Sequence, residues 1–202
     1  MKLYFSKGAC SLAIRITINE LGIPCEYESV NLKTKETANG ADFLKINPKG
    51  SVPVLQLNDN TFLTEGAAIQ QYLADSNKAD QLLPPVGNIQ RYHVIEWLTF
   101  IATELHKGCG VFFSSAISDQ IKNDVFRPML INKLKLVEQQ LAKSSFISGN
   151  QFSLADSYLF VILNWLQFAS IDIKDFPHTA KYFATLAQRP SVMKSLKEEG
   201  FM

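Results

Sequence analysis

Two neighbouring segments, Asn47-Pro-Lys-Gly-Ser-Val-Pro-Val-Leu55 and Phe62-Leu-Thr-Glu-Gly-Ala-Ala-Ile69, carry the most structural information in this sequence. Pro53 opens a short apolar run and cannot donate a ladder hydrogen bond there. If the Val52–Pro53 bond is cis, the N–H and C=O of Val52 face outward, unpaired, and can bind an extended peptide as another strand would. A helix beginning at Glu65-Gly66 offers free N–H groups to a carboxylate, while Glu65 can hold an ammonium. Together the segments predict a site for a small acidic peptide. Each segment alone is typical of an ordinary loop that leads into a strand or helix.

The rest of the chain divides into a mixed part and a helical part. The first eighty residues alternate strand and helix signals in the order βαβ, then ββα, which is the order of a thioredoxin-like domain. Leu83-Pro-Pro-Val-Gly87 is a Pro/Gly linker, after which no strand pattern survives. We expect an α/β domain over 1–81 and an all-α bundle over 87–202. The predicted strands are 2–5, 25–30, 54–57 and 61–63; the predicted helices are 12–20, 41–44, 66–75, 89–108, 124–143, 152–169, 176–188 and 191–200.

Composition narrows the class of function. The 202 residues are 47% hydrophobic and 19% charged, with a net charge of +1 and scattered Lys and Arg, so nothing indicates a nucleic-acid or membrane partner. The first residues carry charge too early for a signal peptide. Cys10, Cys25 and Cys109 show neither Cys-x-x-Cys nor zinc spacing, so we expect free thiols in a reducing cytoplasm and no metal.

Cys10 is the first candidate for chemistry. It stands just before a predicted helix, where the dipole and the free N–H groups stabilise a thiolate and lower the thiol pKa. The alternative is an inert residue that packs the turn. Among nearby hydroxyls, Tyr4 lies within the first strand, and Ser11 is predicted to be the N-cap of the helix.

The segments 47–55 and 62–69 resemble the glutathione-binding half of the cytosolic glutathione transferases. The resemblance covers the whole chain. Gly8-Ala-Cys-Ser-Leu-Ala13 and Thr103-Glu-Leu-His106 resemble the bacterial beta class in particular, and Phe152-Ser-Leu-Ala-Asp156 extends the likeness to the second half. The resemblance implies that glutathione sulfur lies beside Cys10, as a thiolate or a mixed disulfide. A tyrosine common in that class is replaced here by Phe5, which argues against a tyrosine-dependent mechanism.

Residues of the helix from Ile89 form a second candidate group. Val94, Leu98, Ile101 and Leu105 form an apolar stripe, and Thr99, Thr103 and His106 form a separate polar stripe that could simply be solvated. The resemblance implies that this polar stripe faces the glutathione cleft and that His106 tunes the sulfur. The class commonly has Asn where this chain has Thr99, so that contact stays open.

The resemblance implies further contacts with glutathione. Lys35 matches the cation that holds the glycine carboxylate, with Lys33 as the nearby alternative and Lys49 as a second positive charge. Glu104 is implied as a contact from the partner subunit. The full set expected to bind glutathione is Cys10, Lys35, Val52, Glu65, Gly66, Thr99, Thr103, Glu104, Leu105 and His106, with Cys10 and His106 catalytic.

Two features of the second half complete the candidate residues. Ser153 and Asp156 form a capping box at the start of a strongly apolar helix, which predicts a structural role. Phe112, Phe113 and Trp165 are candidate walls of an apolar cleft, although such aromatics more often belong to a core.

The function implied by the resemblance is a homodimeric, cytoplasmic glutathione transferase that joins the glutathione thiol to hydrophobic electrophiles in detoxification. Glutathione is then the co-substrate and no other cofactor is needed. Two alternatives stay open: thiol–disulfide or peroxidase chemistry at Cys10, and a non-enzymatic carrier of glutathione or hydrophobic ligands.

Overall fold

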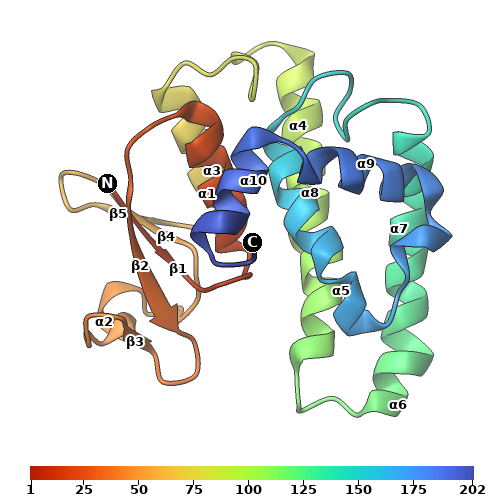
Figure 1. Ribbon diagram of the computed structural model, residues 1–202, viewed down its shortest axis with the longest axis horizontal. Helices are drawn as coiled ribbons and strands as arrows, with labels where there is room; N and C mark the ends of the chain where they lie inside the picture. Colours follow the sequence, from red (N-terminus) through yellow and green to blue (C-terminus); the bar gives the residue numbers. More distant parts are fainter. The chain divides into compact units, whose positions relative to one another are not determined.

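A computed structural model describes all residues from 1 to 202 and contains two compact units (Figure 1). The first unit comprises Met1–Ala79 together with Arg189–Met202, and the second comprises Asp80–Gln188. No helix has both the length and the apolar composition needed to cross a membrane.

The first unit is built on a five-stranded sheet of order β3-β2-β1-β4-β5. The central strand β1 (Lys2–Phe5) pairs in parallel with β2 (Glu26–Asn31) and antiparallel with β4 (Val54–Gln56). The edges are β3 (Glu36–Thr37) and β5 (Phe62–Thr64). The predicted thioredoxin-like order is confirmed; β3 was not predicted, because a two-residue strand leaves no alternation in the sequence.

Successive side chains of the strands build two separate cores, one on each face of the sheet. Leu3 and Leu55 pack with residues of α1 (Ser11–Leu21) and α3 (Gly66–Ser76), whereas Tyr4 and Val54 pack with Phe43 of α2 (Phe43–Ile46). The helix α1 ends as predicted at Gly22, whose φ of 65° is left-handed and suits a residue without Cβ.

The helix α10 (Pro190–Glu198) packs against α1 within the first unit (Figure 1). Arg189 pairs with Glu20, and Asn19 donates to Ser195 Oγ at 2.9 Å. By its contacts, Arg189–Met202 therefore joins the sheet unit, whereas the sequence predicts it within the helical domain 87–202. The domain limits themselves stay a prediction.

The second unit is entirely helical, and each helix predicted between residues 89 and 188 has a counterpart in it. The helix α8 is buried almost throughout, as its apolar sequence predicts. Two stretches predicted as plain α-helix contain π-helical turns, η1 and η3, which apolar periodicity does not reveal. The elements are α4 (Ile89–Phe100), η1 (Ile101–His106), α5 (Lys107–Gly110), η2 (Val111–Phe113), α6 (Asp119–Ile121), η3 (Lys122–Phe126), α7 (Arg127–Leu141), α8 (Leu154–Asn164), η4 (Leu166–Ala169), η5 (Ile173–Asp175) and α9 (Pro177–Ala187).

Glu138 of α7 caps the start of α9, and this contact should make stability depend on pH. Its carboxylate accepts hydrogen bonds from His178 N at 3.0 Å and from Thr179 N at 2.8 Å. Burial raises the pKa of Glu138, but these hydrogen bonds outweigh burial and hold the pKa below its ordinary value of 4.5. A lowered folded-state pKa adds stability above about pH 4.5 that is lost as the pH falls further.

We therefore expect Glu138→Ala to lower the free energy of unfolding by about 1 kcal/mol at pH 7, and by clearly less at pH 3.5. Urea unfolding at both pH values measures the difference. The matched control is Gln139→Ala at the next, exposed position of the same helix, whose effect should be small and independent of pH. An equal loss for Glu138→Ala at both pH values would contradict the assignment.

Candidate functional site

Cys10 lies at the N-terminus of α1, as predicted. It is the N-cap residue, with φ −58° and ψ −19°, and its side chain is half-buried. Its Sγ donates a hydrogen bond to the carbonyl oxygen of Val52 at 3.3 Å. The thiol is therefore fixed beside the segment that contains Pro53.

The prediction that Ser11 caps this helix is wrong. Ser11 is the first helical residue and is fully buried; its Oγ donates to Ser6 O and accepts from Ser6 N, both at 3.2 Å. These contacts tie the helix to the end of β1. Tyr4 is also buried and donates to Gln56 Oε1 at 3.1 Å, and burial raises its pKa, so it is a poor acid or base for chemistry at the thiol.

The Val52–Pro53 bond is cis, which is the condition under which the sequence predicts an outward-facing Val52. We expected both main-chain groups of Val52 to be unpaired. This is wrong for the carbonyl, whose oxygen accepts a hydrogen bond from the Cys10 thiol. Val52 is also only 7% exposed. The Val52 N–H makes no hydrogen bond within the chain. One main-chain donor is therefore left for a peptide, next to a carbonyl that already binds a thiol.

Lys35, rather than Lys33, reaches the turn before Pro53. The Lys35 ammonium donates to the carbonyl oxygen of Gly50 at 2.8 Å. Gly50 has a φ of 63°, and a Cβ there would lie 3.1 Å from a methyl of Leu44 and 3.4 Å from Lys35 Cε. Glycine therefore suits this left-handed turn, where a side chain would be strained and would crowd Leu44.

Glu65 occupies a strained backbone position immediately before α3. Its φ of 70° is unusual for a residue with a side chain. Its Oε1 lies 2.6 Å from the Lys49 ammonium, which also donates to Thr64 Oγ1 at 2.9 Å. The Lys49 and Glu65 side chains are 55% and 69% exposed, so the pair contributes little to stability and another ammonium can replace Lys49 at small cost.

Within the first unit, three contacts thus link the predicted residues: Cys10 with Val52, Lys35 with Gly50, and Lys49 with Glu65. Gly66 begins α3 directly after Glu65, which leaves the first N–H groups of that helix at the same place. The first unit therefore gathers a thiol, a main-chain donor, a cation and a carboxylate.

In the second unit, Thr99 and Thr103 lie on exposed positions of α4 and η1. The Thr99 hydroxyl donates to Ile95 O at 2.8 Å, and the Thr103 hydroxyl donates to Thr99 O at 3.0 Å. Each hydroxyl proton is therefore used within the helix, and the hydroxyl oxygens remain available as acceptors.

His106 does not simply continue the stripe of the two threonines. The π-helical turn η1 ends at His106, and its Nδ1 lies 2.5 Å from the hydroxyl oxygen of Tyr158. The ring also meets Trp165 edge-on, with centroids 5.0 Å apart. The imidazole is thus oriented by α8, because the hydrogen bond to one ring nitrogen determines the role of the other.

The remaining predicted residues of this unit differ in accessibility. Leu105 is fully buried, as its place in the apolar stripe predicts, so its side chain belongs to the core. Glu104 is half-exposed and forms an ion pair with Lys133 of α7. This pairing holds the pKa of the Glu104 carboxyl below its ordinary value.

Two of the three aromatic residues predicted to line an apolar cleft contact each other. Phe113 is 50% exposed and meets both the Trp165 ring, at 5.4 Å between centroids, and the Phe168 ring, at 5.1 Å. Trp165 itself is buried, and Phe112 makes no ring contact in this cluster. Phe113 and Phe168 therefore offer the exposed apolar surface beside His106.

Sequence reasoning missed Tyr158 as a functional candidate. A signal was present, because Tyr158 is the only tyrosine in the apolar stretch from Phe152 to Ala169, and a buried tyrosine hydroxyl usually needs a hydrogen-bond partner. The identity of that partner, 52 residues earlier in the chain, could not be obtained from local pattern.

Cys109 should be chemically silent in the folded protein. It is 1% exposed, and burial raises the pKa of its thiol to about 12. Because alkylation requires an accessible thiolate, we expect iodoacetamide at mildly alkaline pH to leave Cys109 unmodified in the native state and to modify it in urea. Peptide mass spectrometry measures the labelling; rapid native labelling at Cys109 would contradict this prediction.

Comparisons with known proteins agree with this arrangement. Family models for the glutathione S-transferase N-terminal domain and C-terminal domain match residues 8–76 and 100–190. The glutathione S-transferase GstA of Escherichia coli O157:H7 is 45% identical, over 99% of each chain.

Solved structures extend the likeness to three dimensions. A sphingomonad glutathione S-transferase complexed with glutathione is 40% identical, covers 100% of both chains and has a TM-score of 0.95. The beta-class glutathione S-transferase of Sphingomonas chungbukensis is 39% identical, with the same coverage and TM-score. The matching models and the full-length relatives show that this chain belongs to the glutathione S-transferase family, where it is an enzyme similar to the bacterial beta class.

Proposed function

We propose that this transferase holds glutathione on the first unit through Cys10, Lys35, Val52, Glu65 and Gly66. The observation that carries the proposal is the Cys10 thiol at 3.3 Å from Val52 O. Lys35 and Glu65 contact Gly50 and Lys49, which belong to the same segment 47–55 as Val52. The Val52 N–H pairs with the peptide, and Lys35 binds the glycine carboxylate. Glu65 exchanges Lys49 for the ligand ammonium, while the N–H groups at Gly66 bind the γ-glutamyl carboxylate.

The second unit contributes acceptors and an oriented imidazole in this proposal. Thr99 and Thr103 accept hydrogen bonds, since their protons are already donated within the helix. His106, oriented by Tyr158, acts on the glutathione sulfur, and Leu105 takes part only through its main chain. Glu104 serves the partner subunit of a homodimer.

The proposed reaction is substitution or addition at a hydrophobic electrophile. The glutathione thiol loses its proton to solvent or to His106, its sulfur forms a bond to carbon, and a leaving group such as chloride departs with the electron pair. The exposed rings of Phe113 and Phe168 supply apolar surface for such a substrate. Glutathione is the co-substrate, and no further cofactor enters this reaction.

The direct test is conjugation of glutathione to 1-chloro-2,4-dinitrobenzene, measured by absorbance, with Lys35→Met and Glu65→Gln as site variants. We expect activity in the wild type and a rise in KM for glutathione of about tenfold in each variant, as expected for losing one charged contact. Lys33→Met, next to the site but without a contact to Gly50, is the matched control. Equal KM values for all four proteins would sink the assignment of these residues.

A second candidate reaction is thiol–disulfide exchange at Cys10. The half-buried thiol at a helix N-terminus favours it. The Cys10 thiolate would attack a glutathionylated disulfide and release the other thiol; a second glutathione would then attack the mixed disulfide, giving glutathione disulfide and free Cys10. Disulfide reductase activity that vanishes in Cys10→Ser, while conjugation persists, would separate the two reactions.

The cellular setting is part of the same proposal. Three cysteines outside any disulfide fit a reducing cytoplasm, and the class resemblance supports a homodimer. Light scattering should then give twice the chain mass of 22.6 kDa; a monomer mass in an active preparation would contradict the dimer.

A further inference from the structure

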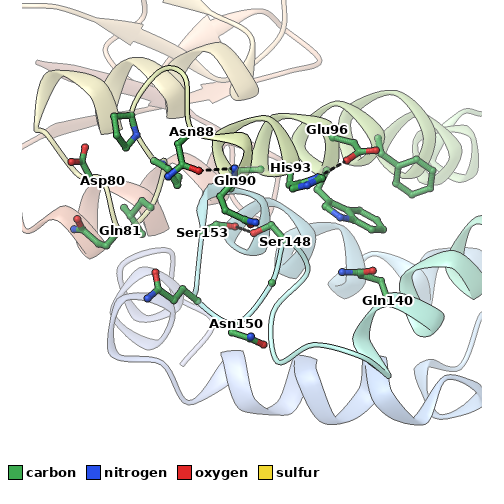
Figure 2. A pocket seen from close by; sticks show the side chains of 18 of the residues that line it. Asp80, Gln81, Asn88, Gln90, His93, Glu96, Gln140, Ser148, Asn150 and Ser153 are labelled. Carbon is green, nitrogen blue, oxygen red and sulfur yellow. Dashed lines mark hydrogen bonds and ion pairs between the residues drawn. The ribbon is translucent and has the colours of Figure 1, made fainter.

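A cavity of about 1030 Å³ lies in the helical unit, between α4, the end of α7 and the loop 148–153 (Figure 2). The ion pair of Glu104 and Lys133 joins α7 to η1, which continues α4. Glu104 is the residue proposed to serve the partner subunit, so this face belongs to the proposed dimer and offers no free ligand site. A feature that bears on the Cys10 thiol lies instead in the first unit.

The chain reaches Cys10 through a tight turn directly before it. Ala9 N donates to Ser6 O at 3.0 Å, which closes a β-turn with Lys7 and Gly8 as its central residues. Gly8 has a φ of 70°, a left-handed conformation that suits a residue without Cβ. Because this turn leads into the N-cap of α1, its geometry determines where the Cys10 side chain lies.

The end of α10 is shaped to meet this turn. Gly200 N donates to Lys197 O at 3.0 Å. Phe201 N donates to Leu196 O at 2.9 Å, and the two bonds together form the Schellman pattern that ends a helix. The Gly200 φ of 71° is left-handed, and a Cβ there would lie 3.4 Å from the Lys7 ammonium nitrogen. The motif therefore directs the last residues of the chain back onto the turn.

The three residues that follow α10 all contact the two central residues of the turn. Glu199 Oε2 accepts a hydrogen bond from Gly8 N at 2.8 Å. The Gly200 carbonyl oxygen accepts from the Lys7 ammonium at 2.9 Å, and that ammonium also lies 4.8 Å from the centroid of the Phe201 ring. A Cβ on Gly8 would come within 3.0 Å of the same ring. Both central residues are therefore held by the end of the chain.

Glu199 also joins the turn to the helix that follows Cys10. Its side chain has no exposed surface, and its Oε1 accepts from Arg15 Nε at 3.1 Å. One carboxylate therefore bridges Gly8 and Arg15, which lie on either side of Cys10 in the chain. A buried carboxylate is costly unless charged and polar donors compensate it. Here the compensating donors belong to the two segments that fix the thiol.

We propose that Glu199 and Phe201 are positioning residues for Cys10, because they hold the turn before α1 so that the thiol stays against Val52 O, 3.3 Å away. Without these contacts the turn opens more often, and the half-buried thiol leaves Val52 and meets solvent. This positioning rests on the proposed function only for the reaction that the thiol then serves.

The test measures how fast iodoacetamide labels Cys10 in the full-length protein at mildly alkaline pH, without glutathione. We expect Phe201→Ala, which removes a half-exposed ring, to speed the labelling of Cys10 about threefold, as for the loss of one cation–π contact. Phe201→Leu keeps an apolar side chain over Gly8, and its rate should fall between those of the wild type and Phe201→Ala. Met202→Ala, at the next and more exposed position, is the matched control and should change nothing.

Cys25 provides the internal reference. It is a half-buried thiol of the same unit, and it donates to Glu26 O at 3.2 Å and not to the turn. Peptide mass spectrometry separates the two cysteines, so the ratio of the Cys10 rate to the Cys25 rate is measured in one sample. If Phe201 only stabilised the unit as a whole, its loss would speed both cysteines and leave the ratio unchanged.

Circular dichroism verifies that each variant is folded before the rates are compared. An unchanged ratio in folded Phe201→Ala, or an equal rise of the ratio in Met202→Ala, would overturn the proposal. If the ratio rises as expected but the wild type does not conjugate glutathione, the result supports the positioning of Cys10 and counts against the proposed function alone.

Discussion

Replacing Asp156 with alanine is expected to lower the free energy of unfolding by about 3–5 kcal/mol, several times the effect of losing an ordinary helix cap. The side chain is completely buried at the start of α8. Its Oδ2 accepts from Ser153 N at 2.8 Å and Ser153 Oγ at 2.7 Å, which confirms the predicted capping box. A cap alone would account for about 1–2 kcal/mol.

The larger figure comes from contacts that the sequence does not reveal. Asp156 Oδ1 also accepts from Ile147 N at 2.8 Å and from Tyr182 Oη at 2.7 Å. In Asp156→Ala these buried donors lose their acceptor, and each unsatisfied donor costs about 1–3 kcal/mol. The carboxyl therefore joins the loop before α8 and the helix α9 to the centre of the helical unit.

Urea unfolding monitored by circular dichroism measures this effect. The matched control is Asp172→Ala, which removes an exposed N-cap of η5 that accepts only from Lys174 N; its cost should stay near about 1 kcal/mol or below. A loss no larger in Asp156→Ala than in Asp172→Ala would refute the network role.

The second large effect is expected for Arg15→Met, which should destabilise the protein by about 3–5 kcal/mol at pH 7. The Arg15 side chain is 3% exposed, and its Nε donates to Glu199 Oε1 at 3.1 Å. The guanidinium also lies over the Tyr27 ring, at 3.7 Å from its centroid. Methionine keeps most of the packing volume but leaves the buried Glu199 carboxylate without its cation.

The pH dependence of this loss has a definite sign. Burial raises the pKa of Glu199, while Arg15 lowers it, so removing Arg15 raises it further. A raised folded-state pKa favours folding below the unfolded value of about 4.5 and loses that benefit as the pH rises. Arg15→Met should therefore cost less at about pH 4.5 than at pH 7.

A double variant separates charge from packing. Arg15→Met with Glu199→Gln should recover at least half of the loss at pH 7, because the lone buried charge is removed. Urea unfolding of the single and double variants gives the comparison. If the double variant is no more stable than Arg15→Met, the loss belongs to packing against Phe5 and Tyr27 and not to the uncompensated carboxylate.

Local signals explain what the sequence could predict. Gly22 ends α1, Pro53 marks the turn into β4, and the Ser153–Asp156 box begins α8, because each feature depends on residues a few positions apart. The same holds for Cys10 at the start of α1. Strand alternation and helical periodicity then allowed the order of strands and helices to be predicted.

Features that depend on distant partners could not be predicted. The Ser11 hydroxyl turns to Ser6 instead of capping its helix, and Val52 O is bound by a thiol 42 residues earlier. The π-helical turn at Ile101–His106 retains apolar residues at α-helical spacing, so the reorientation of His106 toward Tyr158 leaves no trace in the pattern. The positive φ of Glu65 likewise has no sequence marker, since glycine is the usual residue there.

The place of α10 has a consequence for how the protein is made. Glu199 Oε2 accepts from Gly8 N at 2.8 Å, and Lys7 donates to Gly200 O at 2.9 Å, so the loop that leads to Cys10 is held by residues almost two hundred positions later in the chain. The helical unit is thus an insertion within the first unit. During translation, the sheet unit begins to emerge first from the ribosome, yet it cannot complete these closing contacts until residues 189–202 have emerged as well.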